Sequence, residues 1–193
     1  MNRIRAKIRR LAARIGITDR RGVAAVEFAL IAPLFAMLLA AMIDFGGVLY
    51  TKFQLDSAVS AGANYALVNA ASVNSVNGAT LASTVARVVA TSQGAAWANG
   101  GIVVNNGPTS TVTSGTAVAS GTASNADSCY CPTTSGSTFS WGSAATCSSS
   151  CPSGGLAGKF VRISASRAYT PMFSSYGIVS SHTITATALV QVQ

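Results

Sequence analysis

The sequence predicts an α+β protein: a long N-terminal membrane-spanning helix continues into a small exported head with a second helix and a short antiparallel sheet. Three observations lead to this prediction. An apolar run lies near the N-terminus, small and apolar residues follow it at helical spacing, and apolar and polar residues alternate at the C-terminus. The length of 193 residues fits one domain with an appended segment.

The composition argues against a typical cytosolic protein and against an enzyme. Charged residues make up 9% of the chain and hydrophobic residues 49%, whereas ordinary soluble domains carry roughly 25% charged residues. The chain has one histidine, His182, and one glutamate, Glu27. These are too few for an acid–base or metal constellation. We therefore expect no catalytic residue, no metal site and no cofactor.

Basic residues are concentrated in residues 1–22, which we expect to form a cytoplasmic arm. Apolar residues at helical spacing lie between the cations, which is typical of a basic amphipathic helix on an anionic membrane surface; these are Ile4, Ile8, Leu11 and Ile15. Basic runs also attract nucleic-acid phosphates, and an Arg-rich N-terminus is similar to an organellar transit peptide. The apolar run that follows favours a membrane anchor and no nucleic-acid partner.

Residues 23–50 are predicted to form the transmembrane helix. Phe28 to Ile43 is a run of 16 residues without a charge, and residues from about 28 to 48 supply the roughly 20 apolar residues that a span needs. One alternative is a buried core helix of a soluble protein. The other is a cleaved secretory signal, whose apolar region of about 7–15 residues is shorter than this run.

The charges around the span predict its orientation. Arg20 and Arg21 end a run of cations before the span, and Lys52 is the one cation close behind it. The positive-inside rule then places the N-terminus in the cytoplasm and residues 51–193 outside. Asp44 lies near the outer end of the span, where we expect its carboxylate to reach the membrane interface.

Glu27 is the most informative residue, because a charged acid at the centre of a membrane helix costs about 2.5–3.5 kcal/mol. In one interpretation Glu27 lies near the headgroups and is solvated. In the other, the bond after Gly22 is cut and Val23 gains a free ammonium group. That group would lie one helical turn from Glu27, and the two opposite charges would neutralise each other between neighbouring helices.

The string R-G-V-A-A-V-E-F-A-L-I-A-P-L-F at 21–35, followed by I-D-F-G at 43–46, resembles the TadE-like family. These proteins are minor pseudopilins of the tight-adherence (Flp) pilus, within the type IV pilin class. The resemblance covers residues 21–66, and a weaker one recurs at 161–173.

What this resemblance implies is a pilin-like subunit anchored in the bacterial inner membrane. A prepilin peptidase would cut between Gly22 and Val23, in a processing motif that includes Glu27 and Phe28. The partners would be the lipid bilayer, pilus subunits, the inner-membrane assembly platform and the peptidase, and the head would lie in the periplasm or in the pilus. The alternative is a permanently anchored, single-pass envelope scaffold or adhesion protein that is never cut.

Residues 51–104 are predicted to be an exported helical region. Leu55, Val59, Gly62 and Ala66 recur at steps of four, three and four, and such small residues permit close helix packing. Their partner is either another subunit's helix or the head of the same chain. We expect a second helix from about 79 to 93 and a short strand over 102–104.

Residues 105–157 are rich in Ser, Thr and Gly and are predicted to be a loop. All four cysteines lie there: Cys129, Cys131, Cys147 and Cys151. An even number of cysteines on the exported side indicates disulfides. We expect two bridges between the C-x-C pair and the C-x3-C pair, since a bridge within C-x-C would close a very tight loop. A zinc site is the rival, although the spacing departs from the usual C-x2-C pairs.

Residues 158–193 are predicted to form two strands. Val161, Ile163 and Ala165 alternate with polar residues between 160 and 169. A second alternation covers 182–192, where the apolar face is Ile184, Ala186, Ala188, Val190 and Val192. We expect an antiparallel sheet packed on the base of the long helix, with His182 on the surface at a strand start.

Overall fold

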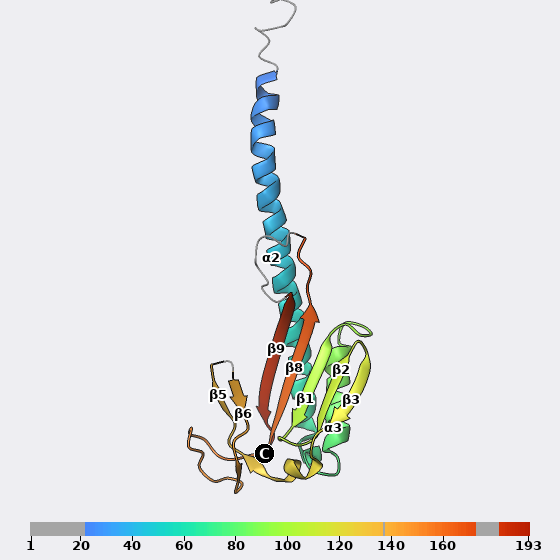
Figure 1. The fold of residues 1–193 in the computed structure, drawn as a ribbon, viewed down its shortest axis with the longest axis vertical. Coiled ribbons are helices and arrows are strands. Elements are labelled where there is room, and N and C mark those ends of the chain that lie inside the picture. The colour runs from blue at the N-terminus through green and yellow to red at the C-terminus, as the bar shows by residue number, and fades with distance from the viewer. Residues whose placement is uncertain (1–21, 137, 173–181) are drawn as a thin grey trace, which may run out of the picture. The chain divides into compact units, whose positions relative to one another are not determined.

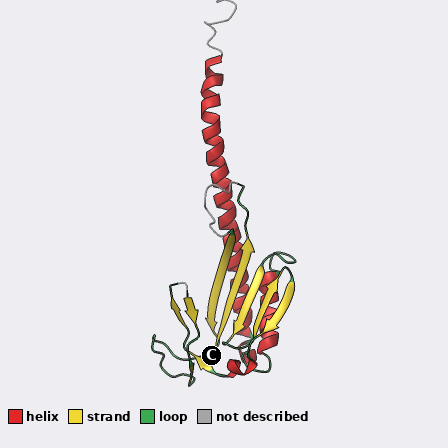
Figure 2. Cartoon of the chain, viewed as in Figure 1, coloured by secondary structure: helices red, strands yellow, loops and turns green. Residues whose placement is uncertain are grey.

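The computed structural model describes residues 22–136, 138–172 and 182–193 (Figure 1). The chain forms two compact units, residues 1–44 and residues 45–193. The long helix α2 (Val23–Val68) begins in the first unit and ends in the second. The α+β fold class is confirmed, because a long apolar helix, a second helix and an antiparallel sheet are all present (Figure 2). The arm before residue 22, with its expected amphipathic helix, lies outside the described residues.

A five-stranded antiparallel sheet forms the centre of the second unit, with the strand order β3-β2-β1-β8-β9. Its strands are β1 (Asn99–Val104), β2 (Thr109–Thr113), β3 (Thr116–Ser120), β8 (Phe160–Ala168) and β9 (Thr183–Gln191). Two small two-stranded sheets lie between β3 and β8 in sequence. They pair β4 (Cys129–Tyr130) with β7 (Ala144–Ala145) and β5 (Thr133–Ser135) with β6 (Thr138–Ser140).

The predicted alternation places apolar residues on one face of the sheet. Ile163 on β8 and Ile184 on β9 are buried, as is Ile102 on β1. They contact the buried side of α3 (Gly78–Ala90) and of residues 45–68 of α2 in one core cluster. This confirms the two C-terminal strands and the strand expected over 102–104, which begins three residues earlier than expected.

Gly62 marks close packing of α2 against α3. A Cβ built on Gly62 would lie 2.8 Å from Val89 Cγ2 and 3.2 Å from Val85 Cγ1. Leu55, Val59 and Ala66 on the same side of α2 are buried. The small-residue face therefore packs on the head of its own chain, which decides between the two partners that the sequence left open.

Gly62→Leu is expected to destabilise the second unit by about 1–3 kcal/mol, because the added side chain overpacks a filled core. Ala61→Leu is the matched control, since residue 61 is exposed on the same helix turn. The control is expected to change stability by less than about 0.5 kcal/mol. Urea unfolding of the full chain measures both, and equal midpoints would contradict the packing.

Helix α3 is shorter than expected and follows a turn that the Asn74 side chain holds. The Asn74 Oδ1 accepts hydrogen bonds from the backbone N–H groups of Val76 (2.9 Å) and Asn77 (2.7 Å). Both donors precede the helix, so Asn74 orders the turn that leads into it. Leu81, Val85 and Val89 are buried as the helical spacing predicted, and Val88 is half-buried.

The prediction of a loop over 105–157 was wrong for the strands β2 to β7, and most clearly for residues 109–120. Those residues form β2 and β3, joined by a two-residue turn in which Ser114 has φ 50° and Gly115 has φ 82°. Both turn residues adopt the left-handed conformation that tight hairpins need. The strands form although large aliphatic residues are few, because threonines fit a half-exposed pleated surface.

Asn105 joins three parts of the second unit just after β1. It is completely buried, with φ 49°. Its side-chain Nδ2 donates to the backbone oxygens of Ala126 and Ser128, and its Oδ1 accepts from the backbone N–H of Phe160 (3.1 Å). One amide side chain therefore satisfies backbone groups from the segment before β4 and from the start of β8.

Candidate membrane helix and disulfide-linked lobe

The N-terminal part of α2, residues 23–43, is called here the apolar segment, because apart from Glu27 it is apolar on all sides. Its large side chains are exposed, including Leu30 at 75% and Phe28 at 72%. Residues 23–43 span about 32 Å along the helix axis, and the hydrocarbon core of a bilayer is about 30 Å thick. The helix is long and apolar enough to cross a membrane, and none of its most apolar window is buried. The exposure of these side chains argues against a core helix of a soluble protein.

The helix runs through Pro33, which lies inside α2. Proline removes one backbone hydrogen bond of a helix. Neighbouring helices can compensate for that loss in a membrane.

The residues of the expected processing motif lie together at the start of α2. Gly22 precedes the first helical residue, Val23, and no heavy atom lies within 4 Å of a Cβ built on Gly22. Glu27 and Phe28 follow in the next turn, and all four residues are exposed. Val23 and Glu27 are separated by four residues, so they lie on one face of the helix. Arg20 and Arg21 lie outside the described residues.

Asp44 is buried in the structure, whereas we expected its carboxylate to reach a membrane interface. Its side chain is 1% exposed, while Ile43 and Phe45 beside it are exposed. Asp44 and Glu27 lie about 26 Å apart along the helix axis. The helix therefore does not bring these two acids together. A buried carboxylate needs compensating partners, and Asp44 has an interaction partner in the structure.

Comparison with protein families gives one match that includes the processing motif. Residues 22–64 match the family model described as TadE-like protein. The segment 22–64 is TadE-like. This match confirms the resemblance seen in the sequence and ends before α3, so the TadE-like segment contains the apolar segment and most of the helix beyond it. Residues 161–173 lie outside it. No curated protein and no solved structure matches the chain.

Among the described residues, one helix is long and apolar enough to span a membrane. Together with the TadE-like segment, it suggests a single-pass membrane protein associated with the tight-adherence pilus. TadE-like proteins are not known as enzymes. In the part of the chain that the structure describes, no group of three or more His, Cys, Asp or Glu residues is placed to hold a metal ion.

The four cysteines close a separate lobe, defined here as residues 129–158 and called the disulfide lobe. Cys129 bonds to Cys147 and Cys131 bonds to Cys151, with Cα–Cα distances of 5.1 and 5.6 Å. This confirms two bridges between the C-x-C pair and the C-x3-C pair. All four thiols are used in disulfides, so the zinc alternative is wrong for this state of the chain.

An aromatic cluster joins the disulfide lobe to the main sheet. Trp141 makes edge contacts with Phe139 (ring centroids 5.1 Å apart) and with Tyr130 (6.1 Å). The guanidinium carbon of Arg162 on β8 lies 4.5 Å from the centre of the Phe139 ring. Sequence reasoning singled out the three aromatic residues as exceptions in a polar region but missed Arg162. No local signal identifies it, because it lies more than twenty residues after Phe139.

Asp127 ties the lobe's entrance to the turn before α3. Hydrogen bonds from the Ser75 side chain and backbone N–H lower the pKa of Asp127 below its ordinary value of 3.8, and Lys159 adds a weaker charge effect. A carboxyl group with a depressed pKa stabilises the fold above its unfolded pKa. This contribution is present above about pH 3.8 and is lost as pH falls through the lower, folded-state pKa.

Proposed function

We propose that the chain is a pilin-like minor subunit of a Flp (tight-adherence) pilus system, anchored in the bacterial inner membrane. A prepilin peptidase cuts it between Gly22 and Val23, and the apolar segment then packs against pilus subunits or the assembly platform. The head stays in the periplasm or enters the pilus, and the role is not enzymatic. The observation that carries the proposal is the TadE-like match over residues 22–64, which begins at the proposed cleavage site.

The geometry at the start of α2 supports cleavage at this bond. Gly22 is exposed and precedes Val23, the first residue of α2, so a cut between them leaves α2 intact. The new ammonium group of Val23 then lies about 6 Å along the axis from Glu27. Two opposite charges at one level lower the cost that either would carry alone in an apolar environment.

The intact mass of the protein from native membranes tests the proposal. The expected mass is that of residues 23–193, because the peptidase removes the arm. Gly22→Ile is expected to keep the full-length mass, since a bulky side chain replaces the small residue at the cut. The variant leaves the fold unchanged, because the position has open space around it.

Gly46→Ile is the matched control for Gly22→Ile. A Cβ on Gly46 also meets no heavy atom within 4 Å, and Gly46 lies on the same helix away from the cut. The control is expected to be processed like the wild type. A full-length wild-type mass would instead support the second candidate, a permanently anchored envelope scaffold or adhesion protein, and would remove the role assigned to Glu27.

A further inference from the structure

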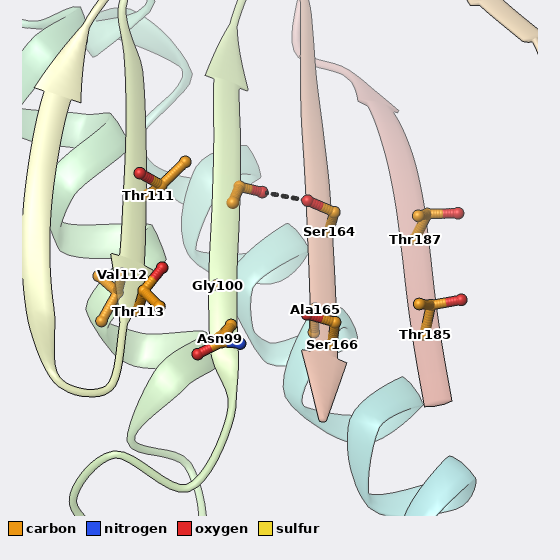
Figure 3. A pocket seen from close by; sticks show the side chains of 11 residues that line it. Asn99, Gly100, Thr111, Val112, Thr113, Ser164, Ala165, Ser166, Thr185 and Thr187 are labelled. Carbon is orange, nitrogen blue, oxygen red and sulfur yellow. Dashed lines mark hydrogen bonds between the residues drawn. The ribbon is translucent and has the colours of Figure 1, made fainter. Parts of the chain in front are cut away.

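The face of the main sheet opposite α3 carries a dense array of hydroxyl groups. Six serine and threonine residues of β2, β8 and β9, together with Asn99 of β1, line this face (Figure 3). They line a shallow cavity of about 440 Å³. The hydroxyl-bearing residues are Thr111, Thr113, Ser164, Ser166, Thr185 and Thr187, and we call this surface the hydroxyl trough.

Gly101 forms the floor of the hydroxyl trough. It pairs with Thr111 on one side and with Ser164 on the other. A Cβ on Gly101 would lie 2.7 Å from Ser164 Oγ, which donates a hydrogen bond to the Gly101 carbonyl oxygen (2.9 Å). β1 therefore has no side chain at this position. Thr111 on β2 and Ser164 on β8 place hydroxyl groups on either side of the gap, each on a strand about 4.8 Å from β1.

A second cavity of about 320 Å³ adjoins the trough and shares Thr187 with it. Its lining includes Phe139, Arg162 and Leu189. Arg162 lies over the Phe139 ring, so its charge already has a partner. The hydroxyl trough thus leads at Thr187 to a rim with aromatic and aliphatic surface.

We propose that the hydroxyl trough binds a neutral polysaccharide. Serine and threonine hydroxyls both donate and accept hydrogen bonds, as do sugar hydroxyls, so the two surfaces match group for group. On the rim, Leu189 is exposed and supplies apolar surface for the C–H face of a sugar ring. This binding goes beyond the proposed pilus role and does not depend on cleavage at Gly22.

The charge of the lining favours a neutral ligand. Arg162 is the single charged residue among the residues that line the two cavities. An anionic polymer would be recognised by several cations. An amphipathic helix would need a wide apolar groove. Among the described residues that line the trough, the apolar side chains are Val112 and Ala165, and both are buried.

Binding is tested with the full chain in lipid nanodiscs, because detergents with sugar headgroups would compete. The probes are maltohexaose, cellohexaose and mannohexaose, with oligogalacturonate as the charged comparison, measured by titration calorimetry. Saturable binding of at least one neutral probe is expected. The double variant Thr111→Val/Thr187→Val is expected to weaken it at least tenfold, since it removes hydroxyls without changing side-chain shape.

Thr116→Val/Thr133→Val is the matched control. Both threonines are exposed on strands and line neither cavity. The control is expected to bind within twofold of the wild type. Three results would overturn the proposal: no binding of any neutral probe, preferential binding of oligogalacturonate, or self-association of the chain that the trough variant abolishes. Each readout is separate from the processed mass that tests the pilus role.

Discussion

Asn105→Ala is expected to lower the free energy of unfolding of the second unit by about 3–5 kcal/mol. The substitution leaves the carbonyl oxygens of Ala126 and Ser128 and the N–H of Phe160 without their partner. Each buried polar group left unpaired costs about 1–3 kcal/mol. Alanine also tolerates the left-handed backbone at this position less well than asparagine does.

Asn106→Ala separates the hydrogen bonds from the backbone effect. Asn106 also has a positive φ, 56° against 49° for Asn105, and its side chain makes no hydrogen bond among the described residues. The control is expected to cost about 1–2 kcal/mol. Guanidinium unfolding followed by Trp97 fluorescence measures both variants. Similar losses for the two would show that Asn105 acts through its backbone conformation alone.

Removing the disulfides is expected to unfold the disulfide lobe while the main sheet remains. The two bridges join residues 18 and 20 positions apart, and closing loops of that size stabilises a fold by about 3 kcal/mol each. The lobe has little core of its own, since its described buried hydrophobic residues are Cys129, Tyr130 and Ala157. Without the bridges, this burial does not offset the conformational entropy of the loop.

The two tryptophans distinguish local from global unfolding. Trp141 lies in the aromatic cluster of the lobe, whereas Trp97 lies under Arg167 of β8, 4.9 Å from the guanidinium carbon to the ring centre. When Trp97→Phe is added to the quadruple Cys→Ser variant, Trp141 is the remaining tryptophan, and its fluorescence is expected to be that of a solvent-exposed indole. A Trp141→Phe chain is expected to keep the native signal of Trp97. Loss of both signals together would mean that the sheet depends on the lobe.

The main helix and the C-terminal strands could be predicted from the sequence because local periodicity determines them. The apolar segment is recognised by its length and composition, and the alternation around Ile163 and Ile184 identifies the buried face of each strand. Neither signal depends on the rest of the chain. The residues of the expected processing motif also lie within one short string, and cleavage there stays a prediction. The tight C-x-C spacing predicted that the two bridges join the two cysteine pairs, but it left open which cysteine bonds to which.

Other features could not be predicted, because they depend on contacts between distant segments. β2 and β3 were missed since their threonines resemble loop composition, although Ser114-Gly115 between two Thr-rich runs is a hairpin signal. The hydroxyl trough requires four strands in register, and Arg162 meets Phe139 through tertiary structure alone. Burial of Asp44 likewise has no local signature.

The strand order has a consequence for when this protein can fold. The central strand β1 is flanked on one side by β2, which follows immediately in the chain, and on the other by β8, whose residues 161–166 come some sixty positions later. A ribosome releases β8 and β9 last, so Ile102 lacks its neighbour Ile163 during most of synthesis. Closing such long loops is slow. The sheet therefore stays incomplete until β8 has been synthesised, while the first helix is already available for insertion into a bilayer.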